Sequence, residues 1–382
     1  MKNIIKTMFF AFLIITISSC ENDKEPIVSA NSFQLRTLES VSSFVLLPQD
    51  NENTVLTFEW DKVNNGVATQ DSNYLLEVAK SGTNFSESLV ANDDEFILTD
   101  RAYVLKVAEL NSLLATAGFQ CGVSTPVDVR IKSVLGNRVG NPFIQYSNVI
   151  TINVTPYSTE TPELAFVTSP SEIAASSKMI SKGILNSEFE GYFYLQSGSY
   201  KFYQPSACGD FASATAIGGT AGTLDTDSAA PSIMIATAGY YLIKANIVAN
   251  TYSVSQYNYF GVYGKAKSTL FSDRALPFVD DDHDNVWTIT VDLYKGRKFK
   301  LKSNYWTALL TGTPPYIPST APIISALGKS STAGQLVSVD PDLNVTDGLI
   351  TVPGTDDGTK VTCIITIDVR NSRDYKYTLV TQ

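Results

Sequence analysis

Histidine is almost absent from this sequence: His283 is the only one in 382 residues. A single histidine cannot form a His-rich zinc site, an HExxH zinc helix or a multi-histidine di-metal centre. A Ser-His-Asp triad would have to use His283, which lies within the acidic run Asp280–Asp284. Any enzymatic activity would therefore have to rest on carboxylates.

Charge and cysteine are also scarce. Charged residues make up 17% of the chain, below the usual ~25%, which argues against a disordered, solvating protein. The net charge of −10 provides no excess of lysine and arginine for phosphate, so we predict no nucleic-acid partner. The 4 cysteines are scattered, unlike those of a small disulfide-bonded scaffold.

Aromatic residues, in contrast, are plentiful. Tyrosine and phenylalanine each occur 19 times, and short alternating segments of aromatic and β-branched residues recur along the chain. Such residues fit a pleated, half-buried surface, and the length allows two or three domains of roughly 100–200 residues. We therefore predict several all-β domains, and nothing in the sequence predicts a metal or a cofactor.

The N-terminus has the pattern of a secretion signal. Lys2 and Lys6 precede the apolar run 8–17, which is shorter than the ~20 residues that span a bilayer. The next residues, Ile-Ser-Ser-Cys, resemble a lipobox, where signal peptidase cuts before a lipidated cysteine, here Cys20. The alternative is an ordinary signal peptide with a chance cysteine.

This pattern predicts a lipoprotein signal peptide over residues 1–19 and a lipidated acidic tether over residues 20–31. Residues 21–25, Glu-Asn-Asp-Lys-Glu, resemble the acidic tag that sends some bacterial lipoproteins to the outside of the outer membrane. We therefore expect a lipid-anchored protein that is exposed on the cell surface.

Residues 32–156 contain short alternating segments bounded by Asn, Gly, Asp or Pro. This spacing is typical of an antiparallel sandwich of the immunoglobulin or fibronectin type III kind. Alternation places Phe58 and Trp60 on one face, so we predict that Trp60 packs in the core. One helix is predicted over 104–117, where apolar residues follow a spacing near 3.6.

An internal repeat follows a Pro/Ser/Thr-rich linker at 156–162. Each copy contains aromatic strands in the same order and ends in a hairpin of the form strand, polar turn, Tyr-x-strand. The copies predict two tandem β-sandwich modules, one over 163–256 and one over 257–382.

Several motifs together resemble a known family. The second copy contains Lys-Phe-Lys-Leu-Lys-Ser-Asn at 298–304, the first contains Gly-Tyr-Tyr-Leu-Ile at 239–243, and residues 107–114 read Val-Ala-Glu-Leu-Asn-Ser-Leu-Leu. With the lipobox, and in this order, they resemble the SusE/SusF family of outer-membrane glycan-binding lipoproteins. The resemblance covers essentially the whole mature chain.

The resemblance implies an immunoglobulin-like spacer domain followed by two carbohydrate-binding-like modules without catalytic activity. In that family such modules bind starch beside a TonB-dependent transporter and a SusD-type lipoprotein. It therefore implies a polysaccharide or oligosaccharide ligand and a SusC/SusD-like transporter complex as partner.

A sugar-binding surface needs an aromatic platform for the apolar face of a pyranose and polar groups for its hydroxyls. Alternation places the lysines of the 298–304 segment opposite Phe299 and Leu301, next to an Asn-Tyr-Trp end. The predicted carbohydrate-binding residues here are Lys300, Lys302, Asn304, Tyr305 and Trp306. The alternative is that Trp306 folds into the core and the lysines form a solvated face.

The corresponding segment of the first copy lacks tryptophan. It offers Lys201 and Tyr203, with Phe211 as a further aromatic residue. We expect this site to be weaker or lost. Because the tryptophan-bearing motif occurs once, the glycan could be one other than starch.

Three alternatives stay open. The run Asp280–Asp284 matches the start of a calcium loop but lacks its glycine and its bidentate glutamate, so a solvated surface loop is favoured over a calcium site. A surface glycosidase would need two carboxylates roughly 5–10 Å apart, which no sequence motif pairs. A structural adhesin or assembly protein would use the same β-modules to bind protein.

Overall fold

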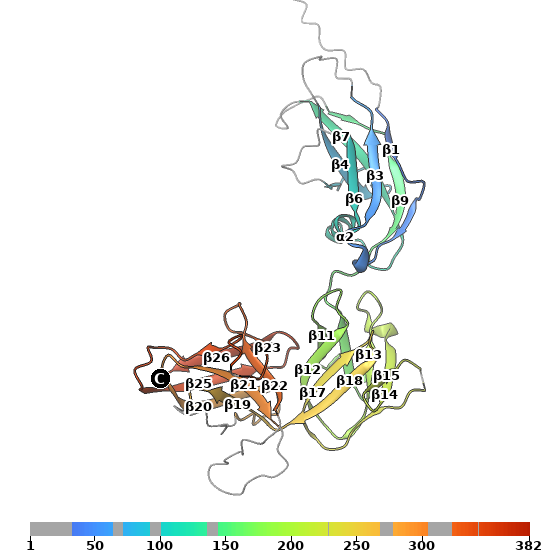
Figure 1. Ribbon diagram of the computed structural model, residues 1–382. Coiled ribbons are helices and arrows are strands. Elements are labelled where there is room, and N and C mark those ends of the chain that lie inside the picture. The colour runs from blue at the N-terminus through green and yellow to red at the C-terminus, as the bar shows by residue number, and fades with distance from the viewer. Residues whose placement is uncertain are drawn as a thin grey trace, which may run out of the picture. The chain divides into compact units, whose positions relative to one another are not determined.

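The structure is a computed structural model that describes residues 33–63, 72–91, 101–135, 144–227, 229–267, 278–304, 323–342 and 344–382. Strands are the main regular structure of these residues, with one α-helix among them, so the predicted all-β fold is confirmed (Figure 1). The chain divides into two compact units, one up to Tyr157 and one from Ser158 onwards.

The N-terminal unit packs two sheets against each other. The smaller sheet has the strand order β1-β3-β6, and the larger has the order β2-β9-β7-β4-β5, with β8 paired to β7. The strands are β1 (Leu35–Thr37), β2 (Ser43–Val45), β3 (Thr54–Trp60), β4 (Ser72–Lys80), β5 (Leu89–Val90), β6 (Ala102–Lys106), β7 (Thr125–Leu135), β8 (Ile144–Tyr146) and β9 (Ile150–Thr155). A short 3-10 helix, η1 (Pro48–Asp50), follows β2.

The core of this unit lies between the two sheets. Phe58 and Trp60 are both buried from one face of β3, and the Trp60 ring lies 5.5 Å from Tyr74 in an edge-on contact. The predicted core role of Trp60 is therefore confirmed. The predicted helix is also present as α2 (Val107–Thr116), but it begins three residues later than expected because β6 continues to Lys106.

Asn111 of α2 holds the C-terminal end of this unit. Its amide is fully buried, donates to the carbonyl of Tyr157 at 3.2 Å and accepts from the Tyr157 N–H at 2.9 Å. We expect Asn111→Ala to lower the free energy of unfolding by about 1–3 kcal/mol, because two partly buried backbone groups of Tyr157 lose their partner. Urea unfolding should show this loss, whereas Ser112→Ala, at an exposed position of the same helix, should stay within about 0.5 kcal/mol. An equal response of the two variants would contradict this role of Asn111.

The first C-terminal module is one nine-stranded sheet that closes on itself. Its order is β10-β11-β12-β17-β18-β15-β14-β13-β16, and β10 also pairs with β13, which leaves no free edge along the ring. The strands are β10 (Glu163–Val167), β11 (Lys178–Ser181), β12 (Glu188–Leu195), β13 (Gly198–Gln204), β14 (Thr215–Thr220), β15 (Thr223–Asp225), β16 (Ile233–Ile235), β17 (Gly239–Asn246) and β18 (Thr251–Tyr257). Two 3-10 helices, η2 (Pro170–Glu172) and η3 (Phe211–Ser213), lie in its loops.

The second C-terminal module has an eight-stranded sheet. Its order is β19-β21-β22-β23-β26-β25-β20, with β24 paired to β21. The strands are β19 (Tyr259–Gly264), β20 (Val286–Tyr294), β21 (Lys298–Asn304), β22 (Ile323–Lys329), β23 (Gln335–Ser338), β24 (Ile350–Thr351), β25 (Lys360–Asp368) and β26 (Tyr375–Thr381). The hairpins expected at the end of each copy are present as β17–β18 and β25–β26.

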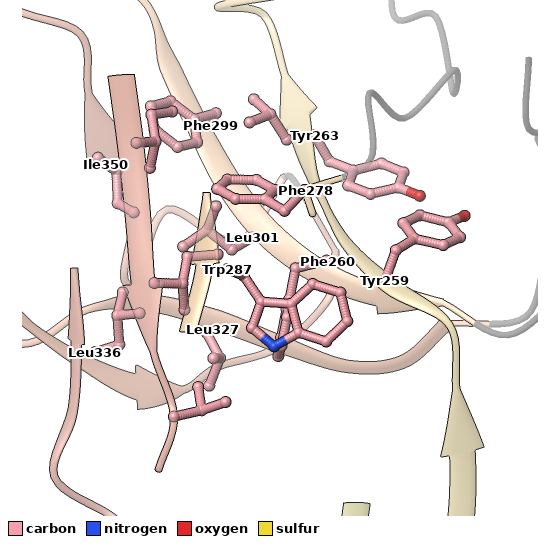
Figure 2. Close-up of a cluster of buried hydrophobic side chains, with 14 of the residues drawn as sticks. Tyr259, Phe260, Tyr263, Phe278, Trp287, Phe299, Leu301, Leu327, Leu336 and Ile350 are labelled. Carbon is pink, nitrogen blue, oxygen red and sulfur yellow. The ribbon is translucent and has the colours of Figure 1, made fainter. Parts of the chain in front are cut away.

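The two C-terminal modules share one aromatic core. Tyr192, Tyr240 and Tyr257 of the first module belong to the same buried cluster as Phe260 and Trp287 of the second. The Trp287 ring lies 4.4 Å from Tyr240, and Figure 2 shows its indole beside Phe260, at a centroid distance of 5.5 Å. The modules therefore form a single compact unit.

Backbone and side-chain hydrogen bonds complete this junction. The turn between β25 and β26 reaches β11 and β12, where the Ser372 hydroxyl accepts from the Ile180 N–H at 2.8 Å and donates to the Glu190 carbonyl. The Arg373 guanidinium donates to the carbonyl of Ile180 at 2.8 Å and to that of Glu188 at 3.1 Å. Each module thus satisfies polar groups of the other.

Candidate functional site

Strand β21 carries three of the residues predicted to bind glycan, Lys300, Lys302 and Asn304. It pairs antiparallel with β19, and the register places Lys300, Lys302 and Asn304 on the same face as Tyr263 and Tyr259. Phe299 and Leu301 point the other way, into the hydrophobic core (Figure 2). The predicted alternation along this strand is therefore confirmed.

The face of Lys300 is covered, contrary to the exposure that we expected. Lys300 is fully buried, and its ammonium donates to the backbone carbonyls of Asp340 and Asp342, each at 2.8 Å. The loop after β23 lies over this face, which the local alternation of β21 could not indicate. Lys300 therefore anchors that loop, and its role as a ligand donor stays a prediction.

Lys302 and Asn304 lie in a buried polar cluster with Tyr263. The Tyr263 hydroxyl donates to the Asn304 side-chain oxygen at 2.9 Å, and the Lys302 ammonium lies 5.2 Å from the Tyr263 ring centroid. Both residues are less than a tenth exposed. This cluster ends directly before Tyr305 and Trp306, which lie outside the described residues, as does Cys20.

The residues predicted in the first module lie on β13. Tyr203 is buried in a small cluster with Ala165, Val167 and Ile173, and this burial raises the pKa of its phenol. Lys201 is partly exposed and opposite Val167 of β10. Tyr203 is thus packed against side chains of its own module and does not present an open aromatic platform.

A cleft on the outer face of β11, β12, β17 and β18 was missed by the sequence reasoning. Its volume is about 390 Å³, and the polar side chains that line it are those of Lys182, Glu188, Glu190, Lys244, Asn246, Thr251, Ser253 and Arg373. The signal in the sequence was the alternation Glu-x-Glu in β12 and Lys-x-Asn in β17. It could not be interpreted because the partner strands lie more than 50 residues apart.

The register of these strands explains why charged groups gather here. Glu190 is opposite Lys244, and Glu188 is opposite Asn246, so the four side chains share one face. The same face continues along β12 to Tyr192, which the second module buries. The outer face is therefore divided into a tyrosine-rich half under the second module and a charged half that forms the cleft.

The acidic run Asp280–Asp284 belongs mainly to the module junction. The Asp280 carboxylate is buried and accepts from the backbone N–H groups of Asp284 and Asn285, at 3.2 and 2.8 Å. The His283 ring stacks on Tyr194 of the first module at 4.2 Å. Among the described residues, no group of three or more His, Cys, Asp or Glu side chains is placed to hold a metal ion.

Comparison with known proteins gives one family. The SusE outer membrane protein family matches residues 21–132. The crystal structure of SusF from Bacteroides thetaiotaomicron is similar at 11% identity, over 91% of this chain and 76% of that one, with a TM-score of 0.23, too low to support an argument about fold or function. No curated protein matches the chain.

The described part of the chain contains no helix long and apolar enough to cross a membrane. The family match covers most of the region that was predicted to be the SusE-type spacer domain, including helix α2 and strands on both sides of it. Over residues 21–132, therefore, the chain is similar to the SusE outer membrane protein family.

Proposed function

We propose that this chain is a non-catalytic outer-membrane lipoprotein that binds a polysaccharide in a Sus-like uptake system. The family match over residues 21–132 carries the proposal, because that family is one of outer membrane proteins. The all-β modules that follow support it, since broad sheet faces and loop ends suit shallow glycan sites. Lipidation at Cys20, exposure on the cell surface and a SusC/SusD-like transporter partner belong to the same proposal.

Within this function, the main site is the end of β21. Asn304 and Lys302 supply an amide and an ammonium group beside the Tyr263 ring, and the chain continues directly into Tyr305 and Trp306. An aromatic platform next to such groups would bind the apolar face and the hydroxyls of one sugar. A single shallow site of this kind is expected to bind near 1 mM, or about −4 kcal/mol, so that capture depends on avidity along a polymer.

Affinity gel electrophoresis tests the function directly. The mature chain is run in native gels that contain amylopectin, pullulan, dextran, galactomannan or arabinoxylan, with bovine serum albumin as the non-binding reference. We expect at least one polysaccharide to retard the chain. If the chain migrates like albumin in all of these gels, the glycan-binding proposal is wrong.

Trp306→Ala should abolish most of this retardation, because it removes the aromatic platform and leaves only the neighbouring polar groups. Tyr146→Ala, which removes a partly exposed ring from the N-terminal unit, is the matched control and should migrate like the unmodified chain. If Trp306→Ala migrates like the unmodified chain, the glycan site does not lie at the end of β21.

A glycosidase is the competing function, and one observation in the cleft favours it: two glutamates lie close together there. Glu188 and Glu190 are two residues apart on one strand face, hence about 6.6 Å along β12, within the range of paired catalytic carboxylates. However, the hydrogen bond from Lys182 lowers the pKa of Glu188, whereas a general acid needs a raised one. Release of reducing ends from a retarding polysaccharide would favour the enzyme.

A further inference from the structure

We propose that the cleft on the outer face of β11, β12, β17 and β18 is a second glycan-binding site. It takes a neutral, hydroxyl-rich sugar residue of an oligosaccharide through the Glu190 carboxylate and the Lys244 ammonium. The inference rests on the proposed glycan-binding function. It adds a site in the first C-terminal module that lies apart from β13, where Lys201 and Tyr203 are found.

The balance of charge in the cleft favours an uncharged polar ligand. Three cations, from Lys182, Lys244 and Arg373, line it together with the two carboxylates of Glu188 and Glu190. Neither a polyanion nor a polycation gains from such a mixture, because each would meet like charges. Hydroxyl groups can donate to a carboxylate and accept from an ammonium group, so a sugar can use both kinds of residue.

Glu190 is the most deeply buried of the charged side chains that line this cleft. Its side chain is 8% exposed, and Oε1 is occupied by the Ser338 hydroxyl, which donates at 2.9 Å. The other oxygen, Oε2, has Lys244 Nζ at 4.0 Å and accepts no hydrogen bond from the residues that the structure describes. Because Glu190 lines the cleft and Oε2 has no donor in the described part of the chain, a ligand hydroxyl can donate to this oxygen.

The second C-terminal module holds the wall of the cleft in place. Arg373 donates to the carbonyls of Ile180 and Glu188, and its Nη1 lies 3.8 Å from Glu190 Oε1. The acceptor and donor groups are therefore positioned before a ligand arrives, which reduces the ordering cost of binding. The Tyr252 ring packs towards Phe202 in the core, at 6.1 Å, so this site depends on hydrogen bonds instead of stacking.

The test uses Lys244→Met and Glu190→Gln in the full mature chain. Lys244 is half exposed, so its replacement leaves the junction intact, and Gln at 190 keeps an acceptor for Ser338. In gels with the named polysaccharide that retards the unmodified chain most, each variant should weaken apparent binding about 3- to 10-fold. The matched controls are Lys329→Met, at an exposed end of β22, and Glu163→Gln, at the start of β10.

The outcomes separate the two proposals. If the unmodified chain is retarded and both cleft variants migrate like their controls, the cleft inference is wrong while the glycan-binding function stands. If only Glu190→Gln weakens binding and its urea unfolding is also altered, the effect comes from the junction and the inference is equally overturned. If no polysaccharide retards the unmodified chain, the proposed function itself fails. Weakening by Lys244→Met with unchanged unfolding supports the cleft.

Discussion

Trp287→Ala is expected to lower the free energy of unfolding of the C-terminal unit by about 3–5 kcal/mol, the largest loss that we predict for a single substitution. Trp287 is 2% exposed, and its ring lies 4.4 Å from Tyr240, 5.9 Å from Tyr257 and 5.5 Å from Phe260. The indole therefore contacts aromatic rings of both C-terminal modules at once. Alanine would leave a cavity that a closed sheet on one side and a paired sheet on the other cannot easily fill.

Urea unfolding followed by circular dichroism measures this loss, with Thr290→Ala as the control. Thr290 lies on the same strand, β20, but is exposed, so its replacement should change the unfolding free energy by less than about 0.5 kcal/mol. Because Trp287 joins the modules, the variant should also expose the connection between β18 and β19 to proteases. A loss below 1 kcal/mol, with unchanged proteolysis, would show that the shared core contributes little.

Lys300→Met is expected to cause the second large loss of stability. The variant also distinguishes a structural role of Lys300 from a role in binding the ligand. Methionine keeps most of the apolar volume of the side chain but removes the ammonium that serves the carbonyls of Asp340 and Asp342. We expect a loss of about 2–3 kcal/mol, because two hydrogen bonds from a fully buried charged group are lost. Amide hydrogen exchange should increase in the loop 339–342.

The control for this prediction is Lys298→Met, on the same face of β21 but exposed. It should leave both stability and hydrogen exchange unchanged. If Lys300→Met proves as stable as Lys298→Met and instead loses glycan retardation, Lys300 is a ligand residue and the anchoring role is wrong. If it loses stability but retains retardation at temperatures where it is folded, the anchoring role stands.

Local patterns predicted several elements of the fold correctly. The alternation around Trp60 placed it in the core, the 3.6-residue spacing predicted α2, and the polar turns between tyrosine-rich strands predicted the hairpins β17–β18 and β25–β26. Each of these features involves residues close together in the chain. Their side-chain periodicity follows directly from helix and strand geometry.

The candidate sites were harder to predict, because exposure depends on distant segments. Alternation correctly assigned Lys300 to the face opposite Phe299 but could not reveal that the loop 339–342 covers that face. Likewise, Tyr203 lies on a strand whose outer side is packed by β10 and the residues around Ile173. A strand pattern distinguishes two faces without indicating which of them another segment will bury.

The sequence by itself therefore determined that this protein is a series of β-modules with aromatic strands, a single histidine and motifs that resemble those of the SusE/SusF family. Only the tertiary structure decided that the two C-terminal modules share one core and that Glu190 and Lys244 meet in a cleft beside Arg373. The reason is physical: strand periodicity is local, whereas a sheet face and a module junction are made by register between strands that are 50 to almost 200 residues apart.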